Sequence, residues 1–286
     1  MGRTINFSMK PEDILNESER ETWSDGIFAR ADGCREEIEA SATKLRKRIE
    51  KEGFTIMPPE YHNIIAFTGD RGTGKTTAML KYQKKLLATQ KDGSEIKYKE
   101  LPMVDPSRMT DGESLLALVI AGIYEKLKDA TKDAEQYSDF YAKNKDKIRE
   151  TAGACCAILR KIRVKAVPVT DSLKDFPDPH DYMEDFSETI KLREKIYELI
   201  QKYLSLYEKA QQLLIPIDDL DTNISSGFEI AREIHHYLSV PNVIILMSLK
   251  LEQLSDLIEQ RYIKSYEEII KQHNRLAPKP TEMAVK

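Results

Sequence analysis

The chain has 286 residues, of which 41% are hydrophobic and 32% charged, and its formal net charge is −4. This length accommodates one large domain or about two ordinary ones, and the composition excludes a disordered chain. The small net charge supplies no overall field that would attract nucleic acid or a membrane surface. No apolar stretch extends over the ~20 residues of a membrane helix, and the cysteines are too few for a disulfide framework. We therefore expect a soluble, cytoplasmic protein with no membrane partner.

The first half of the chain contains two predicted strands, each followed by a helix. A polar arm to about residue 33 precedes a helix that ends at Gly53. The stretch NIIAFTG (63–69) is short, apolar and glycine-ended, which is typical of a buried strand, and a helix is predicted at about 74–87. A second strand is predicted near 97–104, before the apolar helical stretch DGESLLALVIAGIYEKL.

The second half is helical at first and then alternates between strand and helix. The predicted elements are helices over 127–165 and 185–212, strand 213–218, helix 226–238, strand 242–249 and a helix from about 251. Strands separated by helices predict an α/β fold with a parallel sheet covered on both faces, a three-layer core. We divide the chain into an N-terminal arm and helix (1–60), a core (61–126 and 195–286) and a helical insertion (127–194).

The strongest motif is FTGDRGTGKTTAM (67–79), which matches the phosphate-binding pattern G-x-x-x-x-G-K-[ST] between a strand and a helix. Backbone N–H groups of such a loop surround phosphate oxygens at a helix N-terminus, whose partial charge is positive. A chance glycine-rich turn is the alternative, and the strand and helix on either side disfavour it. The predicted phosphate-contacting residues are Gly69, Asp70, Arg71, Gly72, Thr73, Gly74, Lys75, Thr76 and Thr77.

Three residues of this loop have predicted roles. Lys75 reaches the β- and γ-phosphates, the Thr76 hydroxyl binds Mg²⁺, and Thr77 lies on the α-phosphate side. A Cβ atom at Gly69, Gly72 or Gly74 would obstruct either the turn or the approach of the phosphates.

The segment LLIPIDDLD (213–221) is a predicted buried strand that is followed directly by acidic residues. An acid at such a strand end can hold the metal of a phosphate loop through its water shell, which we assign to Asp218, and Asp219 would polarise the attacking water. An ordinary acidic turn is the alternative. Asp221 either caps the next helix or adds to the metal shell, and the structural role is favoured. Pro216 cannot donate to the ladder, so we predict that its missing N–H lies opposite no acceptor or at a bulge.

The stretch NVIILMSLK (242–250) is a third buried strand, and Ser248 stands near its end. The Ser248 hydroxyl either reports on the γ-phosphate and the attacking water or only begins a turn. Basic stretches at 44–51 and 159–165 leave nucleic-acid contact open, although they are typical of solvated helix faces. Arg232 and Arg261 are candidates for an inter-subunit arginine, with surface ion pairs as the alternative.

Together the phosphate loop, the DDLD strand and the Ser248 strand resemble the AAA+/STAND branch of P-loop ATPases, especially KAP-like and bacterial anti-phage ATPases. The resemblance covers about 60–126 and 195–286. It implies an ASCE/AAA+-like core of strand order 5-1-4-3-2, ATP and Mg²⁺ as ligands, and a ring-like homo-oligomer with an arginine supplied in trans. The ATPase subunits of the RADAR defence system are similar, which implies an adenosine deaminase as a possible effector.

The sequence also departs from this pattern. AAA+ proteins usually have Glu at the position of Asp219, and the shorter aspartate implies slow or assembly-dependent hydrolysis. These families continue with a fifth strand and a helical lid, which we expect beyond residue 286, so residues 1–286 are expected to hold an incomplete core. Two functions follow: an ATPase that drives assembly or conformational change, and a nucleotide-gated scaffold with little turnover. A small-molecule kinase would need an acceptor pocket and a lid that the sequence does not reveal.

Overall fold

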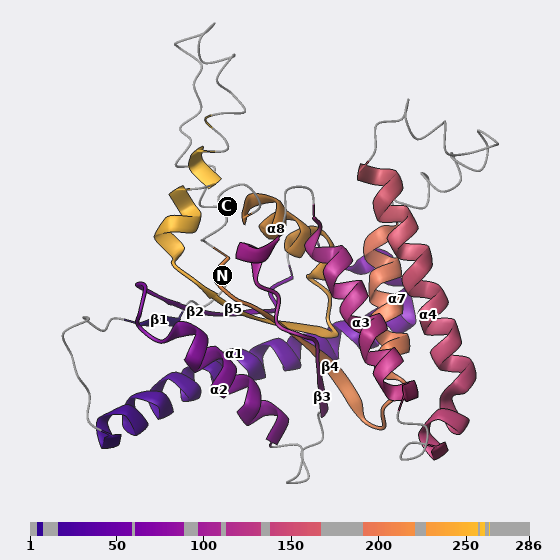
Figure 1. The fold of residues 1–286 in the computed structure, drawn as a ribbon, viewed down its shortest axis with the longest axis horizontal. Helices are drawn as coiled ribbons and strands as arrows, with labels where there is room; N and C mark the ends of the chain where they lie inside the picture. Colours follow the sequence, from indigo (N-terminus) through magenta and orange to yellow (C-terminus); the bar gives the residue numbers. More distant parts are fainter. Residues whose placement is uncertain are drawn as a thin grey trace, which may run out of the picture.

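The chain folds around a twisted sheet of parallel strands (Figure 1). The computed structural model describes residues 5–7, 17–58, 61–88, 97–109, 113–132, 138–166, 191–220, 227–256, 258–260 and 263. The strands are β1 (Ile5–Phe7), β2 (Ile64–Gly69), β3 (Lys97–Glu100), β4 (Ala210–Ile217) and β5 (Val243–Leu249), and their order in the sheet is β1-β2-β5-β4-β3. The predicted parallel α/β architecture is confirmed.

Helices cover both faces of this sheet. They are α1 (Glu17–Glu52), α2 (Lys75–Ala88), α3 (Leu115–Lys132), α4 (Ser138–Ala166), α7 (Leu192–Leu204) and α8 (Gly227–Glu233), which continues as the π-helical turn η4 (Ile234–Leu238). Short 3₁₀ turns lie at Phe54–Ile56 (η1) and Pro106–Arg108 (η3). In Figure 1, α1 and α2 lie on one face and α3 and α8 on the other, which gives the predicted three layers.

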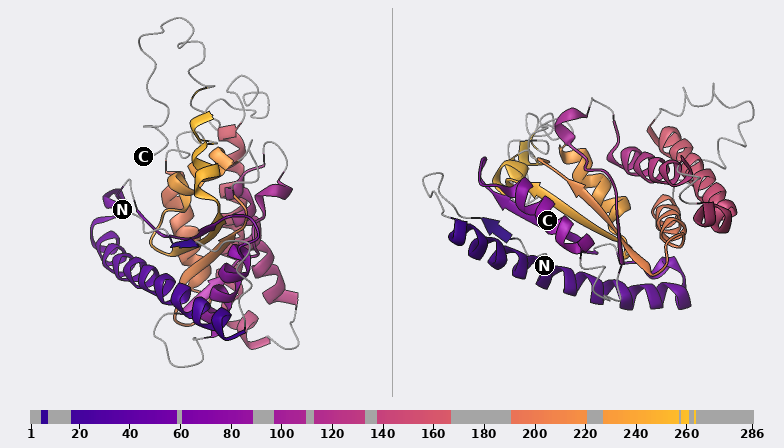
Figure 2. Two further views of the ribbon diagram at one scale, coloured as in Figure 1. Left: turned by 90° about the vertical axis from the view of Figure 1, so that its left-hand side faces the viewer. Right: turned by 60° about the horizontal axis from the view of Figure 1, so that its bottom comes forward.

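The two faces bury different side chains of the same strands, because successive residues of a strand point to opposite sides. In β5, Ile244 and Leu246 pack with α1 and α2, whereas Ile245 and Met247 pack with the helices of the opposite face. On that opposite face α3, α4 and α7 share one core with the sheet. Figure 2 shows α4 outermost in this helical group.

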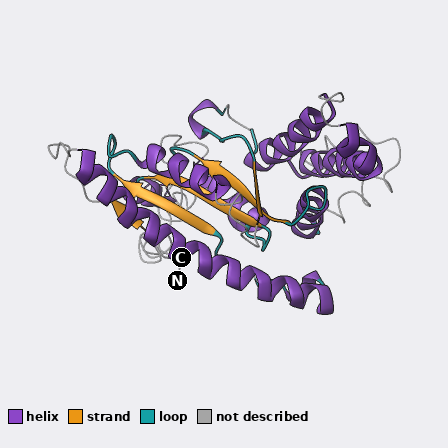
Figure 3. Cartoon of the chain, turned by 90° about the horizontal axis from the view of Figure 1, so that it is seen from below, coloured by secondary structure: helices purple, strands orange, loops and turns teal. Residues whose placement is uncertain are grey.

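Helix α1 is the longest described element and crosses the sheet diagonally (Figure 3). A polar network ties it to the edge strand: Arg35 Nη1 donates to Glu39 Oε2 at 2.6 Å, and the Tyr98 hydroxyl donates to the same carboxylate. Glu39 is buried, and burial raises the pKa of its carboxyl group despite these donors. The N-terminal helix is thus packed onto the sheet.

Several element ends differ between the sequence predictions and the structure. Helix α1 begins at Glu17, within the segment predicted to be an irregular arm, and β1 also lies in that segment. The helix predicted to continue to residue 212 ends at Leu204, and β4 begins at Ala210 after a turn in which Lys209 has a φ of 61°.

The edge of the sheet beside β2 also differs from the expected order. The resemblance placed a fifth strand there, from sequence beyond residue 286. In the structure β1 occupies this position, with Asn6 level with Thr68 of β2. The N-terminal segment therefore fills the edge position next to the strand that leads into the phosphate loop.

Pro216 lies where one side of the ladder is broken, as predicted. Toward β5 the pairing is continuous, and Pro216 is level with Leu246. Toward β3 the Leu101 N–H donates to the Leu214 carbonyl at 3.0 Å, and the next donor, Val104, reaches the Pro216 carbonyl at 2.9 Å. In a regular parallel ladder such donors are two positions apart along the strand, and here they are three positions apart, because β3 ends at Glu100. The irregular segment between Leu101 and Val104 therefore lies opposite the Pro216 nitrogen, which carries no proton.

Among the described residues, no helix has both the length and the apolar character that crossing a membrane requires.

Candidate functional site

The phosphate loop connects β2 to α2 at the carboxyl end of the sheet. The Asp70 carbonyl accepts the Thr73 N–H at 3.3 Å and the Thr73 hydroxyl at 2.8 Å, which closes the loop into a turn. Lys75 is buried, and its Nζ donates to the same carbonyl at 3.1 Å. Arg71 and Thr77 are exposed at the loop and the first turn of α2. The structure thus places the predicted phosphate-contacting residues around one turn at a helix N-terminus.

Gly72 and Gly74 are required by the backbone conformation. Both have a φ of 83°, a left-handed conformation that glycine adopts without the steric cost of a side chain. A Cβ atom at either position would meet no other atom within 4 Å. Two reasons were predicted for these glycines, the turn and the approach of the phosphates. The backbone conformation supports the first, and the space beside both glycines is open to a ligand.

Asp218 is contacted from two other segments of the site. Its Oδ1 accepts a hydrogen bond from Thr76 Oγ1 of the loop at 2.8 Å. The Ser248 hydroxyl, at the end of β5, donates to the same oxygen. Because β5 lies between β2 and β4, the loop after β2, Ser248 of β5 and Asp218 after β4 meet at one edge of the sheet. The open crevice beyond the carboxyl ends of parallel strands is the usual ligand site of such sheets.

Ser248 also positions the next acid. The Asp219 N–H donates to Ser248 Oγ at 3.3 Å, and the Leu220 N–H donates to the Ser248 carbonyl at 3.4 Å. Asp219 has a φ of 47°, a left-handed conformation that is uncommon for residues other than glycine, although asparagine and aspartate adopt it more often than most. Ser248 is fully buried. Its hydroxyl thus holds the turn that carries both acids, a role beyond the two that the sequence suggested.

The side chains present fit Mg²⁺ and a nucleotide. A threonine hydroxyl and a carboxylate oxygen 2.8 Å apart are oxygen ligands of the kind that Mg²⁺ binds together with water and phosphate. Thr76 and Asp218 would hold the ion, and the loop N–H groups and Lys75 would hold the phosphates.

Two residues of the site were not identified from the sequence. Lys250, the first residue after β5, places its Nζ 2.8 Å from Asp70 Oδ1. A polar residue within an apolar strand is conspicuous, as Ser248 is, but a lysine just after a strand is not. Val104 contributes through its backbone, since its carbonyl accepts the Asp218 N–H at 2.9 Å. A backbone contact of this kind has no sequence signal.

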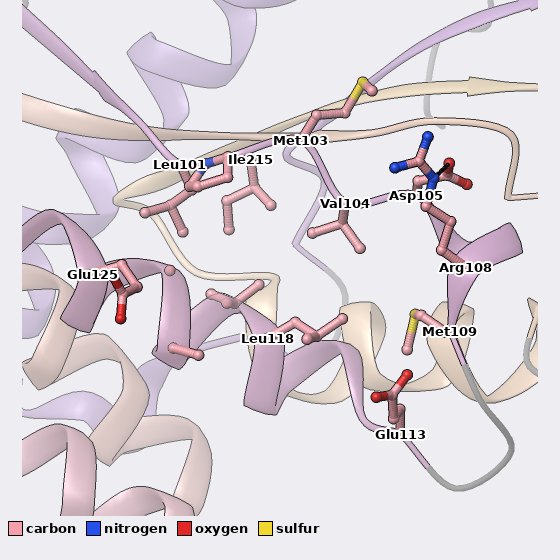
Figure 4. Close-up of a pocket in the computed structure, with 14 residues that line it drawn as sticks. Leu101, Met103, Val104, Asp105, Arg108, Met109, Glu113, Leu118, Glu125 and Ile215 are labelled. Carbon is pink, nitrogen blue, oxygen red and sulfur yellow. Dashed lines mark ion pairs between the residues drawn. The ribbon is translucent and has the colours of Figure 1, made fainter.

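A separate pocket of about 490 Å³ lies between the segment after β3 and helix α3 (Figure 4). Leu101, Val104 and Leu118 line it, and the Asp105–Arg108 ion pair lies at its rim. None of the described phosphate-loop residues contributes to its wall. Among the described residues that line the pocket, Val104 also accepts the Asp218 N–H, and the described phosphate loop lies outside the pocket.

Two further predictions concern Asp221 and the candidate inter-subunit arginines, Arg232 and Arg261. Asp221 and Arg261 lie outside the described residues. Arg232 forms an ion pair with Glu229 one turn earlier in α8, which agrees with the surface alternative.

A glycine-rich loop that ends in Lys75 and Thr76, with the threonine hydrogen-bonded to an acid at the end of a parallel strand two places away in the sheet, defines a P-loop NTPase. The sequence profile of the KAP family P-loop domain matches residues 54–273, which is most of the chain, and the chain belongs to this family. A comparison with curated proteins found no match. Membership implies that the domain binds and hydrolyses a nucleotide.

Proposed function

We propose that the chain is an Mg²⁺-dependent ATPase whose ATP binding and hydrolysis drive assembly or conformational change in a larger complex. The observation that carries this proposal is the convergence of Thr76 and Ser248 on Asp218. An acid that only formed a turn would not need to contact the phosphate loop. The KAP family match supports the nucleotide chemistry, and the choice of ATP rests on the resemblance to AAA+/STAND ATPases.

The site residues divide the reaction among them. The loop N–H groups and Lys75 bind and orient the phosphates, and bound Mg²⁺ supplies positive charge that offsets the charge of the β- and γ-phosphates. A water oxygen attacks the γ-phosphorus as the bond to the bridging oxygen of ADP breaks, and Asp219 accepts the proton. Ser248 keeps Asp218 and Asp219 in place during this step.

The wider role rests on the sequence resemblance. The DDLD strand is similar to that of bacterial anti-phage ATPases, which supports a function in anti-phage defence. The same resemblance supports a ring-like homo-oligomer, an arginine supplied by a neighbouring subunit, and an effector such as an adenosine deaminase.

One observation favours a second candidate, a nucleotide-gated scaffold with little turnover. The residue after Asp218 is aspartate, one methylene shorter than glutamate, and its backbone is held in a left-handed conformation. An acid with this reach and constraint could leave the water unactivated until a partner closes the site.

A single-turnover experiment separates the two candidates. Excess protein is mixed with γ-³²P-labelled ATP and Mg²⁺, and phosphate release is followed over hours, with size-exclusion chromatography in parallel. An ATPase releases phosphate within minutes and changes its assembly state with ATP. A scaffold retains the γ-phosphate for hours. Transfer of the label to a metabolite would instead indicate a kinase.

A further inference from the structure

Lys250 directly follows β5, the strand that pairs with β2 and its phosphate loop. In the parallel pairing of β2 with β5, Phe67 is level with Ser248 and Thr68 with Leu249. Continuing this register places Lys250 level with Gly69, where the phosphate loop begins. The first residue beyond β5 therefore emerges directly beside the loop.

The Lys250 side chain contacts the loop through Asp70. Its Nζ is 2.8 Å from Asp70 Oδ1 and 3.8 Å from Glu252 Oε2. Lys75 approaches the same residue, with its Nζ 3.1 Å from the Asp70 carbonyl. The hydrogen bond and charge of Lys250, more than the charge of Lys75, lower the pKa of the Asp70 carboxyl group. Two ammonium groups thus converge on one loop residue.

The ion pair itself contributes little to the stability of the fold. The Asp70 side chain is 67% exposed and that of Lys250 is 36% exposed, and solvent screens pairs of this kind. A lysine on a flexible four-carbon chain can exchange one exposed partner for another. The terminal phosphate of a bound nucleotide would compete with the Asp70 carboxylate for the Lys250 ammonium group.

We propose that Lys250 is a nucleotide-specificity residue that exchanges Asp70 for the terminal phosphate of a bound nucleoside triphosphate. This inference rests on the proposed function, because it assigns a further contact to the same site. A triphosphate carries a terminal group that can compete with Asp70 for Lys250, whereas a diphosphate leaves the Lys250–Asp70 pair intact. Lys250 thereby favours the triphosphate over the diphosphate and couples the end of β5 to the occupant of the loop.

The test measures dissociation constants for ADP and for a non-hydrolysable ATP analogue by isothermal titration calorimetry with Mg²⁺. A charge-assisted hydrogen bond to a phosphate is worth enough that Lys250→Ala should reduce the preference for the analogue about tenfold, while ADP affinity changes little. Lys250→Arg should retain the preference. Lys84→Ala is the matched control, since Lys84 is exposed on α2, about 13 Å along the helix from Lys75.

Asp70→Asn distinguishes exchange from a fixed ion pair. If Lys250 exchanges partners, removing the competing carboxylate tightens binding of the analogue, opposite to the effect of Lys250→Ala. If the pair only holds the loop in shape, both variants weaken both nucleotides in parallel, and that result overturns the inference. An unchanged preference in Lys250→Ala overturns it as well. Folded wild-type protein that binds neither nucleotide would overturn the proposed function instead.

Discussion

Thr76 Oγ1 donates a hydrogen bond to Asp218 Oδ1 over 2.8 Å, although the two residues are 142 positions apart in the chain. This contact joins the first turn of α2 to the end of β4. It brings a hydroxyl and a carboxylate to the place where a P-loop NTPase holds Mg²⁺. The contact is the structural basis for treating the loop and the acid strand as one site.

Thr76→Val should slow Mg²⁺-dependent turnover about 10²-fold while the fold persists. Valine keeps the shape of threonine and removes the hydroxyl that would bind the ion. Loss of one such polar contact in a reaction centre typically costs about 10²-fold in rate. Phosphate-release assays over a range of Mg²⁺ concentrations measure the effect, with Thr76→Ser as the matched control. Equal activity of Thr76→Val and Thr76→Ser would exclude a metal-binding hydroxyl at this position.

Ser248→Ala should slow turnover more than it weakens nucleotide binding. The substitution removes one donor to Asp218 and the acceptor of the Asp219 N–H, so the turn that carries both acids loses its side-chain support. The lost hydrogen bonds should also lower the free energy of unfolding by about 1 kcal/mol. Calorimetry, phosphate release and chemical denaturation measure the three effects. A variant with normal turnover and reduced stability would show that Ser248 is only structural.

The role of Asp219 as the base can be tested with substitutions that differ in how readily they adopt its left-handed backbone conformation. At a φ of 47°, alanine pays a left-handed cost of about 1–2 kcal/mol, whereas glycine and asparagine accept the conformation more readily. We expect Asp219→Asn to keep wild-type stability and nucleotide binding and to lose turnover. Thermal denaturation and phosphate release measure these properties. Full turnover in Asp219→Asn would transfer the role of base to another group.

Glu39 should make stability depend on pH. Burial raises the pKa of this carboxyl group above its ordinary value of 4.5, so the folded protein binds the Glu39 proton more tightly than the unfolded chain. Its contribution to stability is therefore fully present below pH 4.5 and is lost as the pH rises through the folded pKa. The difference in unfolding free energy between wild type and Glu39→Gln should shift accordingly, in favour of the variant as the pH rises. A constant difference from pH 4 to 8 would contradict this account.

The phosphate loop and the acid strand were predictable because their signals are local. A glycine pattern between an apolar strand and a helix occupies consecutive residues, and so does the run of acids that begins at Asp218. The strand at the edge of the sheet beside β2 was not predictable in the same way. A strand of three residues, Ile5–Phe7, is too short to show a hydrophobic period, and its pairing with β2 depends on the whole fold.

Other differences have specific physical causes. Gly26 and Gly33 lie inside α1 and weaken the sequence signal for a helix, but the buried apolar residues of α1 hold it against the sheet. The helical sequence pattern continues past Leu204, where α7 ends, and into β4. The turn at Lys209 between these two elements is imposed by tertiary structure and has no local sequence signal. The Lys250 contact with Asp70 depends on the register of two strands and was therefore invisible in the sequence.

The most direct test of the central claim is ATP hydrolysis by wild type and by Lys75→Ala under identical Mg²⁺ conditions. Lys75 is the buried cation of the phosphate loop, so its removal should abolish both nucleotide binding and phosphate release. Lys84→Ala controls for the loss of one lysine on the same helix and should hydrolyse ATP as wild type does. Unaltered hydrolysis by Lys75→Ala would show that the measured activity does not come from this site.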